Sequence, residues 1–92
     1  MIKVFLVDDH DIVRMGVARM LDDIKDLVVV GQAKTGEEAI TSVRQLKPDV
    51  VLMDIQMPGI GGVEATRKLA ERFSKIKILA VSAHQEEPLP SR

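Results

Sequence analysis

Acidic residues follow two of the apolar runs in this sequence, and together they could do chemistry. Asp8 and Asp9 come directly after the first run, and Asp54 comes directly after the third. Clustered carboxylates repel one another unless a cation lies among them. An all-oxygen ligand set suits a hard ion such as Mg²⁺, which binds a few carboxylates and keeps several waters. Ser82 comes directly after the fourth run, and its hydroxyl could donate to an anionic oxygen held by that ion.

The apolar runs are the elements that must position these side chains. They are continuous rather than alternating, which is typical of strands buried on both faces of a sheet. They cover residues 4–7, 27–30, 50–53 and 78–81. Stretches of helical periodicity separate them, which predicts βαβ units and a parallel sheet with helices on both faces. Because ligands bind at the carboxyl ends of such strands, the carboxylates of Asp8, Asp9 and Asp54 are expected to meet in one crevice.

Three amphipathic helices are predicted between the runs. The first spans about residues 11–23, with Asp11 as its N-cap. The second begins at a capping box, in which Thr35 precedes Glu38 by three residues, and it ends before Pro48. A glycine-rich turn at residues 58–62 precedes the third helix.

The composition indicates one small domain and excludes several functions. The 92 residues include 13 basic and 14 acidic ones, with no Lys/Arg cluster that would bind nucleic-acid phosphates. The lack of cysteine excludes disulfides, thiol catalysis and Cys-based zinc sites, and it suits a reducing cytosol. No apolar run approaches the roughly 18 residues that a membrane span requires. We therefore expect a soluble cytoplasmic protein without a membrane partner.

A structural interpretation of the same acids is the alternative. In it, Asp8 and Asp9 only precede and cap the first helix, and Asp54 only ends a strand. The combination of acids at the ends of two neighbouring strands favours the functional interpretation. The histidines are instead interpreted as structural, because His10 opens a helix and His84 has no neighbour that would make it a base or a ligand.

Three blocks of this sequence resemble the signature blocks of the response-regulator receiver family. They are Val7-Asp8-Asp9-His10 with Arg14 and Gly16, residues 53–59, and Val81-Ser82-Ala83. Together with residues 64–68 and 87–90, their details are most similar to the NarL/FixJ class and, within it, to the GacA/UvrY type of global regulator. The resemblance implies a flavodoxin-like (CheY-like) doubly wound parallel sheet with the strand order 2-1-3-4.

The resemblance also implies a role for each site residue. Asp54 would accept a phosphoryl group from a sensor histidine kinase, and Asp8 and Asp9 would hold Mg²⁺ together with Asp54. The backbone carbonyl of Gln56 would be a further metal ligand, and Ser82 would be the switch hydroxyl. The chain would be a signalling domain rather than an enzyme, although it could catalyse its own phosphorylation and dephosphorylation.

Compared with that family, residues 1–92 are expected to form an incomplete receiver domain. The last two helices and the fifth strand, with its lysine, would be absent. A C-terminal helix-turn-helix domain, through which such proteins bind DNA, would be absent too. The fourth strand would then be an apolar edge, so we expect poor folding or self-association of this chain. Whether this chain is a fragment of a longer protein or a naturally truncated protein stays open.

Two other functions remain as alternatives. A truncated pseudo-receiver would act only as an interaction module, and phosphotransfer from a small phosphodonor with Mg²⁺ would distinguish it. A Mg²⁺-dependent aspartyl phosphohydrolase commonly carries a second Asp two residues after its nucleophile. Here that position is Gln56, whose amide cannot serve as an acid or base.

Overall fold

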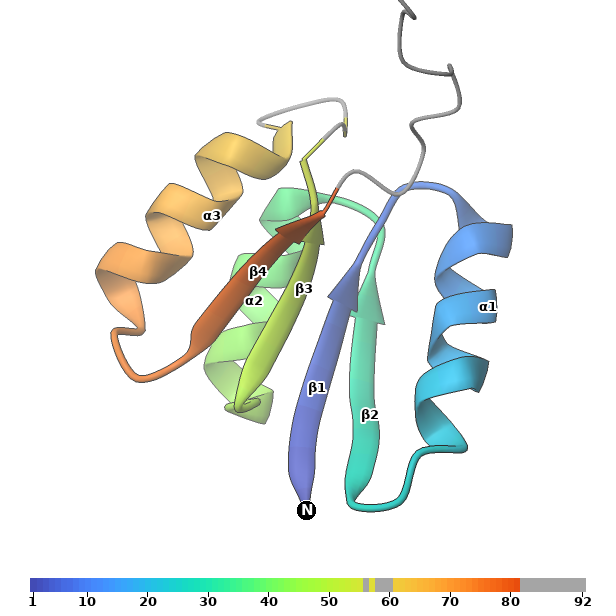
Figure 1. Ribbon diagram of the computed structural model, residues 1–92. Coiled ribbons are helices and arrows are strands. Elements are labelled where there is room, and N and C mark those ends of the chain that lie inside the picture. The colour runs from blue at the N-terminus through green and yellow to red at the C-terminus, as the bar shows by residue number, and fades with distance from the viewer. Residues whose placement is uncertain (56, 58–60, 82–92) are drawn as a thin grey trace, which may run out of the picture.

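The computed structural model describes residues 1–55, 57 and 61–81, and these form a parallel sheet flanked by helices (Figure 1). The strands are β1 (Ile2–Val7), β2 (Leu27–Ala33), β3 (Val50–Asp54) and β4 (Lys77–Val81). The helices are α1 (Asp11–Asp22), α2 (Gly36–Leu46) and α3 (Gly61–Arg72). The strand order is β2-β1-β3-β4 and every pairing is parallel. The predicted doubly wound order 2-1-3-4 is therefore confirmed.

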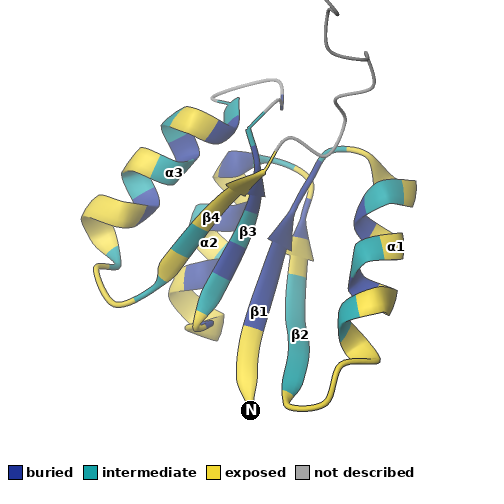
Figure 2. Cartoon of the chain, in the orientation of Figure 1, coloured by how far each residue is buried: buried dark blue, intermediate teal, exposed yellow. Residues whose placement is uncertain are grey.

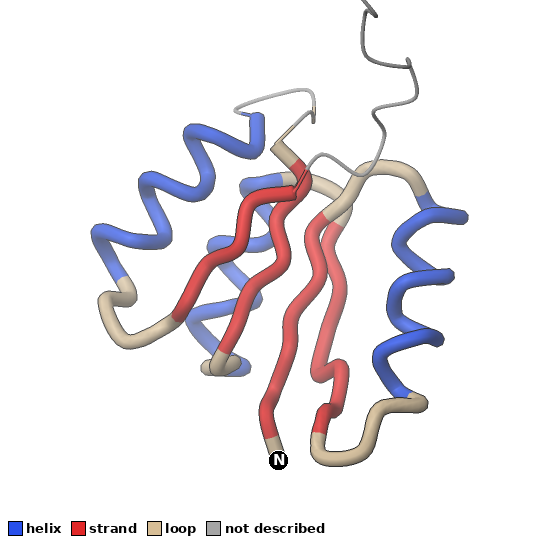
Figure 3. The backbone as a smooth tube through the Cα atoms, viewed as in Figure 1, coloured by secondary structure: helices blue, strands red, loops and turns tan. Residues whose placement is uncertain are grey.

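Helix α1 covers one face of the sheet, and α2 and α3 cover the other (Figure 3). The sheet separates two apolar clusters, because successive strand residues point to opposite faces. The smaller cluster, beneath α1, consists of Val4, Leu6 and Ala18. The larger cluster faces α2 and α3 and contains Phe5, Val7, Ala33, Ala39, Val43, Val51, Met53, Met57, Ala65 and Leu69. Most of the core therefore lies on the α2 and α3 side.

Burial differs between the central and outer strands (Figure 2). Residues 4–7 of β1 are all buried, and β3 is buried or half-buried throughout. In β4 only Ile78 is not exposed, and the side chains of Leu79 and Val81 are 54% and 39% exposed. Burial on both faces, predicted from the continuous runs, thus holds for β1 and β3 but not for β4. At the edge of the described sheet, β4 instead exposes apolar side chains, as the family resemblance led us to expect.

The predicted capping of α2 is confirmed. Thr35 is the N-cap, and its Oγ1 accepts a hydrogen bond of 3.1 Å from the backbone N–H of Glu38. The Glu38 carboxylate reaches back one residue further than a capping box requires, to the backbone N–H of Lys34 at 2.9 Å. The helix ends at Leu46, where Lys47 adopts a left-handed conformation before Pro48.

Two predicted helix starts are wrong. The N-cap of α1 is His10, without a side-chain cap, because the Asp11 carboxylate bonds to Arg14 within the first turn. The predicted turn at residues 58–62 overlaps α3, which already begins at Gly61. Residues 58–60 lie outside the part that the structure describes.

Candidate functional site

The ends of β1 and β3 lie side by side and carry the predicted acids. Val7 pairs with Met53 in the parallel register, so Asp8 and Asp54 follow these residues at the same level of the sheet. The Asp54 side chain is completely buried, and that of Asp8 is nearly so. Two carboxylates buried at neighbouring strand ends concentrate negative charge where a cation is favourable.

A tight cluster of potential ligands forms directly after β1. Among the described residues, Asp8, Asp9 and His10 each offer one ligand atom, and these atoms lie within 4.8 Å of one another. His10 Nδ1 lies 3.6 Å from Asp9 Oδ1, and the His10 backbone N–H donates to Asp8 Oδ1 at 2.8 Å. Asp54 is not a member of this cluster. The structure therefore groups the acidic pair with His10, which we had predicted to be structural, and places Asp54 at the end of the adjacent strand.

The donor atoms of the site fit a hard cation. Asp8 and Asp9 supply carboxylate oxygens, which Mg²⁺ and Ca²⁺ prefer, whereas the imidazole nitrogen of His10 is a ligand more typical of transition metals. The predicted carbonyl ligand, Gln56, and the predicted switch hydroxyl, Ser82, lie outside the described residues. The described part of β4 ends next to Asp54, since Val81 pairs with Asp54 and its carbonyl accepts a 3.0 Å hydrogen bond from Ile55.

The first turn of α3 packs against the backbone of Asp54. A Cβ atom built on Gly62 would lie only 2.1 Å from the Asp54 carbonyl oxygen and 2.2 Å from Ile55 Cα. Both contacts are with backbone atoms, which cannot move aside as a flexible side chain can. Glycine at this position therefore allows α3 to approach the end of β3, next to Asp54.

One residue of the first signature block, Arg14, had been given no role of its own. Arg14 lies in α1 and is buried, and its guanidinium donates hydrogen bonds to Asp8, Asp11 and Gln32. Its place in that block was the only sequence signal, and the structure adds that Arg14 and Ala18 are the two buried residues of α1. The hydrogen bond from Arg14, followed by the charge of Lys34, lowers the pKa of the exposed Asp11 carboxyl below its usual value.

The fold and the paired acidic strand ends define a receiver-type signalling domain. The response regulator receiver domain model matches residues 4–92, and the chain belongs to this family. None of the helices in the described part of the chain has the length and apolar character needed to cross a bilayer.

Curated relatives confirm the predicted subgroup. The response regulator GacA of Pseudomonas syringae pv. syringae (strain B728a) is 60% identical over 92 residues, which are all of this chain and 43% of that protein. The response regulator UvrY of Escherichia coli (strain K12) is 53% identical over 92 residues, all of this chain and 42% of that protein. The chain thus spans less than half the length of these relatives.

Solved structures of response regulators share the fold. The response regulator domain of Thermotoga maritima CheB has a TM-score of 0.85 and 39% identity, covering 95% of this chain and 64% of that one. A LuxR-family two-component response regulator from Aurantimonas sp. SI85-9A1 has a TM-score of 0.81 and 40% identity, covering 85% of this chain and 56% of that one. Both likenesses support the predicted CheY-like architecture.

Proposed function

We propose that this chain accepts a phosphoryl group from a sensor histidine kinase on Asp54. The observation that carries the proposal is the buried Asp54 carboxylate at the end of β3, in register with the acidic pair that follows β1. Membership of the receiver family supports it. The whole protein would then be a two-component regulator whose phosphorylation state controls its output.

The proposed chemistry is a nucleophilic displacement at phosphorus. A carboxylate oxygen of Asp54 attacks the phosphorus of a kinase phosphohistidine, the P–N bond breaks, and the imidazole leaves with the electron pair. The product is an acyl phosphate, which water can later hydrolyse. Because the Asp54 side chain is fully buried, transfer requires a local movement that exposes this carboxylate.

Asp8 and Asp9 are proposed to hold a divalent cation beside Asp54, with Mg²⁺ as the ion. Bound there, Mg²⁺ would neutralise charge on the phosphoryl oxygens. The Gln56 backbone carbonyl is proposed as a further ligand, and the Ser82 hydroxyl is proposed to donate to a phosphoryl oxygen after transfer. In this arrangement the domain would assist its own phosphorylation and dephosphorylation.

The proposed output of the whole protein is transcriptional control through a DNA-binding domain outside residues 1–92. The GacA and UvrY relatives, which are more than twice as long as this chain, support a longer protein. A regulator that controls transcription works where the DNA is, so the same proposal places the protein in the cytoplasm.

Labelling with a small radioactive phosphodonor and Mg²⁺ tests this function. The unmodified chain should take up label, and Asp54→Asn should take up none, because an amide is not a nucleophile here. Asp9→Ala should retain the acceptor but react much more slowly, since a cation ligand is lost. Label retained by Asp54→Asn, with unfolding behaviour like that of the unmodified chain, would show that another residue is the acceptor.

We also propose that the 92-residue chain self-associates through β4. This strand is at the edge of the described sheet, and Leu79 and Val81 are exposed on it. An apolar edge with unpaired backbone groups can pair with the same edge of a second copy. Sedimentation at micromolar concentration should show a dimer, and a strictly monomeric species would contradict this proposal.

A further inference from the structure

Arg14 is a buried cation that the chemistry described so far does not use. Its side chain is 10% exposed and lies in the first turns of α1, facing the sheet. A buried charge is costly unless hydrogen-bonded partners surround it. The position of Arg14 next to an acidic site therefore requires an explanation.

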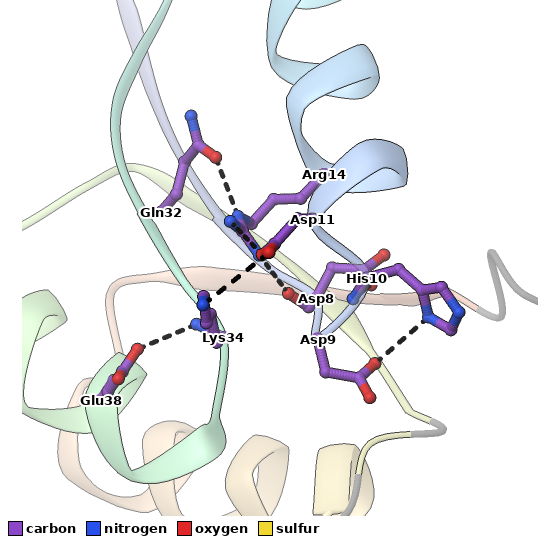
Figure 4. Close-up of polar contacts among 8 residues, drawn as sticks. All are labelled: Asp8, Asp9, His10, Asp11, Arg14, Gln32, Lys34 and Glu38. Carbon is purple, nitrogen blue, oxygen red and sulfur yellow. Dashed lines mark hydrogen bonds and ion pairs between the residues drawn. The ribbon is translucent and has the colours of Figure 1, made fainter.

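The guanidinium group joins three elements of the fold (Figure 4). Nε donates to Gln32 Oε1 on β2 at 2.9 Å, and Nη1 donates to the Asp8 backbone carbonyl at the end of β1, at 2.8 Å. Nη2 donates to Asp11 Oδ1 at 2.8 Å, in the first turn of α1. Because the guanidinium is planar and rigid, these three bonds fix the relative positions of their acceptors.

One of these three bonds acts on the segment that carries the acidic pair, and a backbone bond of the same residue joins it there. The Arg14 side chain holds the carbonyl of Asp8, and the Arg14 backbone N–H donates to the carbonyl of His10 at 2.9 Å. One residue thus holds both ends of the segment 8–10. Fixing the Asp8 carbonyl fixes the peptide plane that leads to Asp9, and so restricts the directions that the Asp9 carboxylate can take.

We propose that Arg14 is a positioning residue for the divalent cation, holding the backbone of residues 8–10 so that the carboxylates of Asp8 and Asp9 converge. The inference rests on the proposed cation site. Arg14 does not touch the ion in this arrangement and acts through the Asp8 carbonyl. The contact between Asp11 and Lys34, at 3.8 Å, extends the same network to the segment before α2.

Charge and positioning predict opposite results when Arg14 is replaced. The guanidinium repels a cation, so removal of its charge alone should strengthen Mg²⁺ binding. Loss of the positioning bonds should weaken it, by roughly ten- to a hundredfold, as is typical for residues that orient metal ligands. The sign of the change therefore distinguishes the two effects.

The test is a Mg²⁺ titration of the 92-residue chain. Binding is measured from the NMR chemical shifts of the backbone amides of residues 8–11 and 53–55. Arg14→Met removes the charge and the bonds, and Arg14→Lys keeps the charge but lacks the planar fork. Arg67→Met is the matched control, because it also removes one arginine charge, from an exposed side chain on α3 that bonds to Glu64 and Glu71. Hydrogen exchange of the His10 amide reports the order of the segment without metal.

We expect weaker binding and faster His10 exchange in both Arg14 variants, with the dissociation constant of Arg67→Met unchanged within about twofold. Unchanged or tighter binding in both Arg14 variants would overturn the inference while leaving the cation site intact. If Arg14→Met does not fold, the same criterion applies to Arg14→Lys. An unmodified chain that binds no Mg²⁺ would overturn the proposed cation site itself and the inference with it.

Discussion

The ends of β1 and β3 both carry acids of the candidate site, but they are held in different ways. After β1, hydrogen bonds from Arg14 hold a short segment with Asp8 and Asp9. At the end of β3, Asp54 lies under α3, whose Gly62 touches the strand backbone. One end is positioned by directional polar bonds and the other by close packing.

The two acidic strand ends should therefore respond differently when a neighbouring residue is substituted. Hydrogen bonds to a backbone carbonyl can be weakened one at a time, so the acidic pair should lose order gradually. Close packing of backbone on backbone has no such intermediate, because interiors are nearly as dense as crystals and even one added methyl group must displace its neighbours. Substitutions at the two ends should therefore differ in size as well as in kind.

The largest effect is expected for Gly62→Ala, which tests the packed end. The added methyl would overlap the Asp54 carbonyl and Ile55 Cα, so α3 must move away from β3. We expect a loss of about 3 kcal/mol in the free energy of unfolding, at the upper end of the usual cost of overpacking. Urea unfolding measures this loss, and phosphodonor labelling should fall with it.

Gly16→Ala is the matched control for that substitution. Gly16 lies in α1, and a Cβ atom there would meet nothing within 4 Å. Alanine should therefore stabilise the chain by roughly 0.5–1 kcal/mol, because glycine is unfavourable inside a helix. If Gly62→Ala and Gly16→Ala unfolded at the same urea concentration, close packing would not be what positions Asp54.

A smaller effect than that of Gly62→Ala is expected for Thr35→Ala, at a strand end that carries no acid of the site. Loss of the hydroxyl that caps α2 should cost about 1 kcal/mol in the free energy of unfolding. Thr35→Ser should restore most of this stability. Labelling of Asp54 should stay unchanged in both variants, and a large loss of labelling would show that the start of α2 also positions the site.

The sequence predicted most of the fold because its signals were local. Continuous apolar runs indicated the strands, and the spacing of Thr35 and Glu38 indicated the start of α2. The exposure of Leu79 and Val81 on β4 was expected only from the family resemblance, since the same kind of run is buried in β1 and β3. A run of apolar residues shows that a strand forms and does not show how much of it is covered.

The site was predicted less completely, because its support depends on contacts between distant segments. The placement of Asp8 and Asp54 at the carboxyl ends of neighbouring strands followed from the parallel sheet. The hydrogen bond between Arg14 and Gln32 joins residues 18 positions apart, and the approach of Gly62 to Asp54 joins two different elements. Asp11 was wrongly predicted as an N-cap. Its carboxylate accepts a hydrogen bond from Arg14 instead, and this bond can be recognised only in the folded helix.

The small apolar cluster beneath α1 has a consequence for motion. Only Arg14 and Ala18 of this helix are buried, while Ile12, Met15 and Met20 are exposed. Segments with few buried apolar contacts open at low free energy, so the amides of α1 should exchange with solvent before those of β1 and β3. Each opening of α1 withdraws Arg14 and releases the acidic segment. A cation that binds only the closed form would therefore slow exchange along the whole helix, at a distance from its ligands.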